Sequence, residues 1–172
     1  AFFGELSLDG SLRHVNGILL LVSVAKSLGF EMVVVPEVNQ EEASLIPDIR
    51  VVGAAHLLNV VDMLIGSSDP EALQTKNLRG YFSQRLPPIV DLSDIKGQAQ
   101  AKRALMIAAA GAHNVLLCGS PGSGKTLLAK ALAGILPSLT VEESLEVTKI
   151  YSLAGLLPKD GVLIRHRPFR SL

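Results

Sequence analysis

The sequence of 172 residues predicts an α/β protein. Two observations lead to this fold class. Short β-branched runs alternate with segments of helical character along the chain, and most segments end at a glycine or a proline. In the second half, an apolar run, a glycine-rich loop over 119–126 and a helical segment follow one another directly, which is the order strand, phosphate loop, helix.

The first half shows local signals for each expected element. The pair Asp9-Gly10 predicts the turn of a hairpin, and Gly29 predicts the end of the first long helix. Asn39 followed by Glu42 forms a capping pattern that predicts the start of a short helix. The expected elements are a hairpin over 2–12, helices over 15–28, 39–46 and 55–65, and strands over 32–35 and 49–52.

The stretch 67–90 has no clear period and is bracketed by prolines, so we expect a linker. Its aromatic pair Tyr81-Phe82 is expected to pack the linker against a domain, with docking on a partner or nucleic acid as the alternative. The expected elements that follow are a helix over 98–110 with Gly111 as its C′ residue, a buried strand over 114–118, a helix over 125–136, and a helix from the Thr140–Glu143 capping pair to Tyr151.

Composition excludes several classes of protein. The hydrophobic fraction of 48% and the charged fraction of 19% are typical of a globular chain. Basic and acidic residues number 16 each, so overall charge indicates no partner. A single cysteine, Cys118, excludes an internal disulfide, fits a reducing compartment and is expected to be a buried structural thiol. The longest apolar run starts at Ile18 and is far shorter than the roughly 20 residues that span a bilayer, so we expect a soluble cytoplasmic protein without membrane contact.

The glycine-rich loop matches the pattern G-x-x-x-x-G-K-[ST] at every fixed position, and a chance match in a chain of this length is below roughly 1%. Glycines allow backbone N–H groups to surround phosphate oxygens, and the following helix directs its positive end at the same anion. We therefore expect the loop to bind ATP through Gly119, Ser120, Pro121, Gly122, Ser123, Gly124, Lys125 and Thr126.

Two side chains of the loop are expected to carry the chemistry. Lys125, the candidate catalytic residue, places a positive charge on the β and γ phosphates. Thr126 offers a hydroxyl ligand to Mg²⁺ and is the candidate metal-binding residue. The sequence thus predicts ATP and Mg²⁺ as cofactors.

The residues around the loop resemble a known family. The runs 94–105, Ala108-Ala109-Ala110-Gly111 and His113-Asn114, together with the loop, resemble the magnesium-chelatase-like AAA+ ATPases of the YifB/ComM family. The stretches 152–155 and 167–171 look like two further parts of that family. Upstream, the runs 3–10 and 34–36 resemble the C-terminal half of a Lon-protease-like domain, which this family carries ahead of its ATPase.

This resemblance implies a domain plan and an activity. The plan is the C-terminal half of a Lon-like α+β domain (of the ribosomal S5 domain 2 type) over 1–66, a linker over 67–90, and the N-terminal part of a P-loop AAA+ domain over 91–172. The segment 95–98 would lie near the adenine. The longer parent would be a ring-forming ATPase, expected as a hexamer, with a branch of the family acting on DNA during natural transformation.

Several positions limit what the resemblance implies. The family usually continues Pro-His-His after the segment that ends at Ser171, whereas this chain has Leu172 and stops. No apolar run ending in Asp-Glu follows the loop within the chain, so Walker B, sensor and arginine-finger residues are expected beyond it. We expect the 172 residues alone to bind ATP without efficient hydrolysis.

Proteolysis is not expected from the Lon-like half. A Lon-type site needs a serine activated by a lysine, but the helix over 17–21 is apolar, and the neighbours Lys26 and Ser27 cannot face each other on a helix. The alternatives to a DNA motor are an ATP-switched scaffold and a metal-chelatase motor subunit.

The histidines do not suggest a metal site. His14, His56, His113 and His166 lack metal-ligand spacing with the cysteine, and two of them, His56 and His113, flank helices as expected capping or surface residues. For the basic tail from Lys159 to Arg170, three roles stay open: contact with DNA, contact with phosphates of a neighbouring subunit, or a solvated loop.

Overall fold

The structure, a computed structural model, describes residues 1–67, 72–73, 90–157 and 163–170. It has a mixed α/β fold and divides into two compact units, Ala1–Ser83 with Val141–Ile164 and Gln84–Thr140 with Arg165–Leu172. Segment 141–164, which the expected plan assigns to the ATPase part, therefore packs with the first unit. Whether the expected domain boundaries hold in a longer parent stays a prediction.

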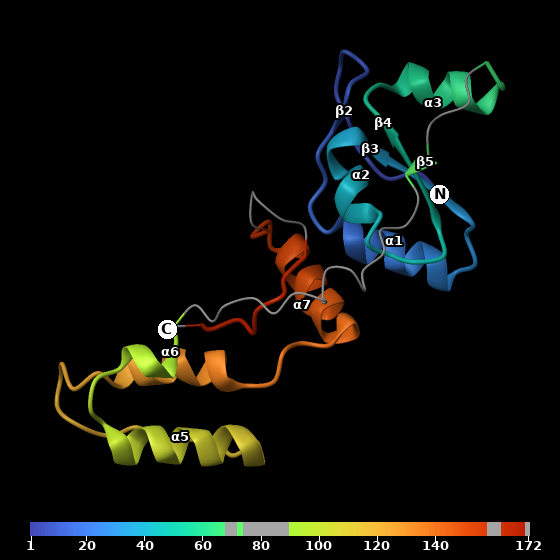
Figure 1. Ribbon diagram of the computed structural model, residues 1–172. Helices are drawn as coiled ribbons and strands as arrows, with labels where there is room; N and C mark the ends of the chain where they lie inside the picture. Colours follow the sequence, from blue (N-terminus) through green and yellow to red (C-terminus); the bar gives the residue numbers. More distant parts are fainter. Residues whose placement is uncertain (68–71, 74–89, 158–162, 171–172) are drawn as a thin grey trace. The chain divides into compact units, whose positions relative to one another are not determined.

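A small sheet forms the centre of the first unit (Figure 1). Strands β3 (Met32–Pro36) and β4 (Arg50–Ala54) pair in parallel, with Val34 opposite Val52. Both strands were expected from their β-branched runs, and both predictions are confirmed. Strand β5 (Ala72–Leu73) pairs antiparallel to β4 although it lies in the stretch expected to be a linker. Residues 68–71 and 74–89 of that stretch, including Tyr81-Phe82, lie outside the described residues.

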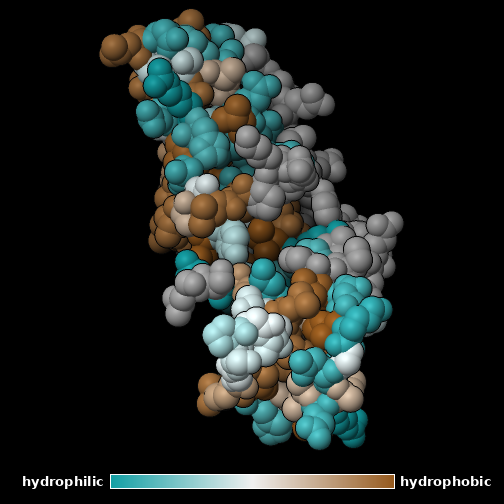
Figure 2. All heavy atoms as spheres, turned by 90° about the vertical axis from the view of Figure 1, so that its left-hand side faces the viewer, coloured by the Kyte–Doolittle hydropathy of each residue, from teal (hydrophilic) through white to brown (hydrophobic). Residues whose placement is uncertain are grey.

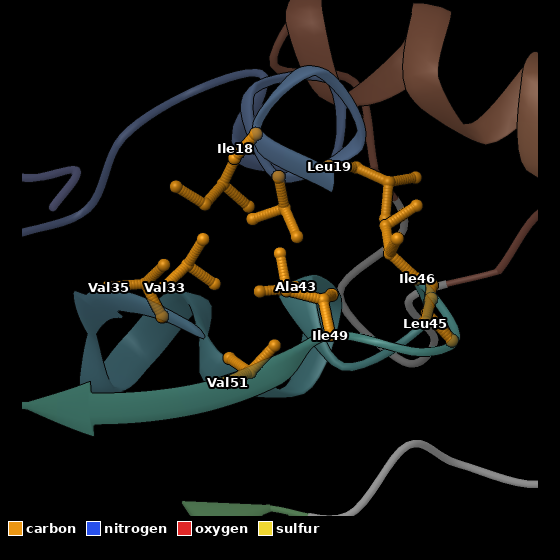
Figure 3. Packing of buried hydrophobic residues seen from close by; sticks show 11 residues of the cluster. Ile18, Leu19, Val33, Val35, Ala43, Leu45, Ile46, Ile49 and Val51 are labelled. Atoms are coloured by element: carbon orange, nitrogen blue, oxygen red, sulfur yellow. The ribbon is translucent and has the colours of Figure 1, made fainter. Parts of the chain in front are cut away.

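Alternate residues of β3 and β4 face two separate cores, as the period of a strand requires. Figure 3 shows one of these faces, where Val33, Val35 and Val51 point toward Ile18 and Leu19. All five side chains are fully or almost fully buried. The opposite residues of each strand face the other core.

Three helices cover the sheet. Helices α1 (Ile18–Ser27) and α2 (Glu37–Ala43) contribute to the first core, and α3 (Leu57–Leu64) packs its Val60 against Val52 in the second. The predicted helix ends are confirmed, because α1 and α3 stop shortly before glycines that adopt positive φ values of 83° and 76°.

The predicted hairpin near the N-terminus is also present. Strands β1 (Glu5–Leu6) and β2 (Leu12–Arg13) pair antiparallel, and Gly10 adopts the left-handed conformation that the turn requires. Within this turn Asp9 accepts hydrogen bonds from the Ser11 hydroxyl and amide, which hold the pKa of its carboxyl below the ordinary value.

His56 caps α3 and joins it to this hairpin. Its Nδ1 accepts a hydrogen bond from the Leu58 amide at 3.1 Å, so the neutral ring carries its proton on Nε2, which donates to the Asp9 carbonyl at 2.8 Å. The capping role expected for this histidine is thus confirmed.

Replacing His56 with alanine should lower the free energy of unfolding by about 1–2 kcal/mol, because the helix cap and the tie to the hairpin are lost together. Urea unfolding followed by circular dichroism measures this change. His113→Ala, which removes an exposed histidine of the second unit, serves as the control. Equal effects of the two substitutions would contradict the capping role.

The prediction for the start of α2 was wrong. The helix begins at Glu37, directly after Pro36, whose φ of −55° already suits the first helical turn. Asn39 therefore lies inside the helix, and its fully buried amide bonds to both backbone groups of Val15 instead of capping. Glu42 is also buried, and its carboxylate accepts a hydrogen bond from the Ser152 hydroxyl.

The second unit contains η1 (Leu92–Asp94), α5 (Ala99–Gly111) and α6 (Lys125–Ile135). Figure 1 shows α5 and α6 side by side, and Leu105, Leu128 and Ala131 meet in their common core. The helix positions are confirmed with small shifts, except that the left-handed residue ending α5 is Ala112 and not Gly111.

Helix α7 (Val141–Leu153) belongs to the first unit and packs against α1. Its start directly after Thr140 agrees with the predicted helix, and its end lies two residues beyond the expected Tyr151. In the part of the chain that the structure describes, no helix is long and apolar enough to cross a membrane.

Candidate phosphate-binding site

The loop 119–126 joins a segment without regular secondary structure to the N-terminus of α6. Its turn is closed by the Ser123 amide, which donates to the Ser120 carbonyl at 3.3 Å. Gly124 stands at the N-cap with φ 83°, and no side chain caps the helix. Because the first amides of a helix have no partner within it, α6 presents uncapped N–H groups toward the loop.

Lys125 reaches back over the loop. Its ammonium donates to the Gly119 carbonyl at 3.0 Å and the Ser120 carbonyl at 2.7 Å, and the Ser123 hydroxyl lies at 3.4 Å. The side chain is thus held by its ammonium group against the backbone of the loop. Phosphate oxygens would be stronger partners for this ammonium than neutral carbonyls.

The charges around the N-terminus of α6 favour an anion. The helix dipole puts partial positive charge there, and Lys125 at the first helical position adds a full one. The first turn of α6 carries no acidic residue to offset it. An anion at this position would therefore interact with both the dipole and the ammonium.

Two glycines of the loop adopt conformations that other residues rarely take. Gly122 and Gly124 have φ values of 78° and 83°, and a Cβ at either would meet nothing within 4 Å. Glycine is favoured at these two positions by the backbone angle alone and not by packing against a neighbour. The residues present therefore fit a phosphate group, since the backbone is accessible from that side.

The expected strand before the loop is not formed. Residues 113–120 form neither a helix nor a strand, and Leu116 is 87% exposed. Cys118 is likewise exposed, so the prediction of a buried thiol was wrong. The physical reason is that an apolar run becomes a buried strand only when a neighbouring strand accepts its hydrogen bonds. Figure 2 shows hydrophobic residues at several places on the visible surface.

The segment before α5 lies next to the loop, a placement that the loop motif by itself did not indicate. Gln98, with φ 54° at the N-cap of α5, directs its side-chain amide at the Ser123 carbonyl at 3.5 Å. Lys102 donates to the Ile95 carbonyl, and Ile95 is buried in the core of this unit. The segment 95–98 is therefore anchored to both α5 and the phosphate loop.

Other residues considered from the sequence do not join this site. Lys26 pairs with Asp48 at 3.1 Å, whereas the Ser27 hydroxyl donates to the Val24 carbonyl, so the two neighbours have separate partners. In the described ranges, no group of histidine, cysteine and acidic residues could hold a metal ion. Of the basic tail, Arg167 donates to the Pro137 carbonyl at 2.7 Å, and Lys159 lies outside the described residues.

The part of the chain that contains this loop matches a known protein family. Residues 91–172 match the family described as magnesium chelatase, subunit ChlI, and residues 1–39 match the family described as subunit ChlI of Mg-chelatase. The second part of the chain is therefore similar to the magnesium-chelatase family.

Whole proteins show the same relationship over most of the chain. The uncharacterized protein Rv2897c of Mycobacterium tuberculosis is 47% identical over 96% of the chain, which corresponds to 32% of that protein. Competence protein ComM of Haemophilus influenzae is 42% identical over 88% of the chain and 30% of its own length. YifB of Escherichia coli is 42% identical over 98% of the chain and 32% of its own length.

A further, local similarity covers the N-terminal part. An archaeal Lon protease from Archaeoglobus fulgidus is 43% identical over 54 residues, 31% of this chain. The predicted resemblance is thus confirmed: the chain is similar to YifB and ComM over most of its length, with partial similarity to Lon proteases. It spans about a third of the length of these relatives.

Proposed function

We propose that this chain is the ATP-binding module of a magnesium-chelatase-like AAA+ ATPase. The observation that supports this proposal most directly is the position of the Lys125 ammonium, which is held over a glycine loop at an uncapped helix N-terminus. The match of residues 91–172 to the magnesium-chelatase family supports the same function.

Different groups of the loop would bind the phosphates and the Mg²⁺ ion. Backbone N–H groups of the loop and the first turn of α6 would hold phosphate oxygens, and Lys125 would exchange its carbonyl partners for the β and γ phosphates. Thr126 would hold Mg²⁺ through its hydroxyl, and the metal supplies charge neutralisation between the phosphates.

The wider architecture is proposed on the same basis. Residues 1–66 would be the C-terminal half of a Lon-like domain, and residues 91–172 the N-terminal part of an AAA+ domain that contains Walker A. Without a carboxylate pair to orient water, the 172 residues would bind ATP but hydrolyse it poorly. The longer parent would assemble as a hexameric ring with ATPase activity.

For the parent we propose a motor that acts on DNA, supported by the similarity to a protein named for competence. Phosphate release by the full-length parent, measured with and without branched DNA, tests this role. Stimulation by DNA is the expected result. Activity that is indifferent to DNA would contradict the motor and favour a metal-chelatase subunit, to which the name of the matched family points.

The Mg²⁺ role of Thr126 makes a separate prediction. Thr126→Val keeps the side-chain shape but removes the hydroxyl, so the gain in ATP affinity on adding Mg²⁺ should fall by about tenfold, while affinity measured in EDTA stays unchanged. Calorimetric titrations in Mg²⁺ and in EDTA provide the comparison. An unchanged Mg²⁺ effect would remove Thr126 from the metal site.

A further inference from the structure

Helices α5 and α6 bring their N-terminal ends together at the phosphate loop. Gln98 is the N-cap residue of α5, and Ser123 directly precedes Gly124, the N-cap residue of α6. The Gln98 Nε2 donates to the Ser123 carbonyl at 3.5 Å, across 25 residues of the chain. This contact joins the start of one helix to the start of the other, and all of these residues belong to the same compact unit.

The backbone of Gln98 has a conformation that residues with a side chain rarely adopt. Its φ is 54°, in the left-handed region, and the preceding Gly97 has φ 66°. A residue other than glycine is disfavoured there because its Cβ comes too close to the backbone. Residues of this kind persist where other contacts hold them, and they gather at functional sites. Ala112, with φ 52°, has the same kind of backbone at the far end of α5.

The segment that carries Gln98 is anchored in the core of its unit. Ile95 is 6% exposed and packs with Leu105 of α5 and Leu128 of α6. The Lys102 ammonium donates to the Ile95 carbonyl, which ties the segment to α5 a second time. Because only two residues separate Ile95 from Gln98, this anchor limits where the glutamine side chain can reach.

The carbonyl that Gln98 contacts belongs to the peptide unit between Ser123 and Gly124. In a planar trans peptide, the C=O and the following N–H point in opposite directions. A donor that holds the Ser123 carbonyl therefore fixes the direction of the Gly124 N–H as well. Gly124 has φ 83°, and glycine adopts negative φ values as readily, so this peptide unit could reverse at low cost without an anchor.

The orientation of this peptide unit matters to a phosphate. Backbone N–H groups attract an anion and carbonyl oxygens repel it, so a reversed Ser123–Gly124 peptide would present the wrong group. The other polar groups of Ser123 are held within the loop, since its amide donates to the Ser120 carbonyl at 3.3 Å and its hydroxyl lies 3.4 Å from the Lys125 ammonium. The Gln98 amide adds a contact from outside the loop.

We propose that Gln98 is a positioning residue of the phosphate loop, which fixes the Ser123–Gly124 peptide so that its N–H is available to phosphate. The inference rests on the proposed ATP binding and adds to it a residue outside the loop motif. Gln98 acts through Ser123, so its loss should affect every ligand that the loop holds by phosphates, with or without a base.

Calorimetric titrations of the 172-residue chain with ATP and with inorganic tripolyphosphate test this role. Gln98→Ala should weaken the binding of both ligands by the same factor, about fivefold. Gln98→Glu should weaken both by at least about tenfold, because a carboxylate has no donor for the Ser123 carbonyl and brings negative charge close to the phosphates. Gln100→Ala, which removes an exposed glutamine from the first turn of α5, is the control and should change neither affinity.

Gln98→Gly separates positioning from a purely structural role. Glycine adopts the left-handed conformation without strain, so the melting temperature followed by circular dichroism should stay constant or rise by about 2 °C. The affinity for both ligands should nevertheless fall by about fivefold, because the amide is gone. Ala112→Gly relieves the same backbone strain at the other end of α5 and should leave both affinities unchanged.

The possible failures are distinguishable. If the unsubstituted chain binds neither ligand, the proposed function and the role of Gln98 are both overturned. If it binds them and the alanine and glycine variants bind equally well, the positioning role alone is wrong. A loss for ATP without a loss for tripolyphosphate would also contradict positioning and would assign Gln98 to the base. A loss in Gln98→Gly that comes with a lower melting temperature would reduce its role to a structural one and overturn the inference.

Discussion

Asn39→Ala is expected to lower the free energy of unfolding by about 2–4 kcal/mol, a large effect for a single substitution. The amide of Asn39 is fully buried and satisfies both backbone groups of Val15, accepting from its amide at 2.9 Å and donating to its carbonyl at 3.0 Å. In the alanine variant, the backbone amide and carbonyl of Val15 lose these hydrogen bonds although they are partly buried.

Urea unfolding at equilibrium measures this loss. Val38→Ala, at an exposed position of the same helix, is the matched control and should change stability by less than about 0.5 kcal/mol. Asn39→Asp should also destabilise, because a carboxylate has no donor for the Val15 carbonyl. An alanine variant as stable as the control would mean that the two hydrogen bonds contribute nothing to folding.

Lys125→Ala is expected to weaken ATP binding by at least about tenfold, equivalent to roughly 1.4 kcal/mol. The substitution removes the charge that the structure holds over the loop, where phosphate oxygens would replace the carbonyls of Gly119 and Ser120. Calorimetric titration with ATP and Mg²⁺ measures the affinity.

Lys130→Ala provides the control for this prediction. Lys130 is an exposed lysine on the same helix, so its removal changes the net charge equally without altering the loop. Circular dichroism establishes that both variants fold. Equal losses of affinity would show a general charge effect, and an unchanged affinity of Lys125→Ala would contradict the assigned role of this residue.

Features that depend on neighbours in the chain could be predicted from the sequence. The hairpin turn at Gly10 and the helix end at Gly29 are set by backbone angles that few other residues adopt. The phosphate loop belongs to the same class, because its glycines, lysine and threonine are consecutive or nearly so. Its geometry follows from local conformation, although the binding of ATP remains a prediction.

Features that depend on distant partners could not be predicted. The run 114–118 has the composition of a strand, but hydrogen bonding in a sheet is decided by another segment. Asn39 satisfies a local capping pattern, yet its partner is Val15, 24 residues away. The packing of α7 in the first unit likewise depends on the contact between Ser152 and Glu42.

The central claim is that residues 119–126 bind the phosphates of ATP, and amide chemical-shift mapping tests it most directly. In a titration of the ¹⁵N-labelled chain with ATP and Mg²⁺, the amide signals of Gly122, Gly124, Lys125 and Thr126 should move and saturate together. Inorganic tripolyphosphate should shift the same four signals, since the loop recognises phosphates. Saturating shifts confined to other residues, or none at all, would contradict the account.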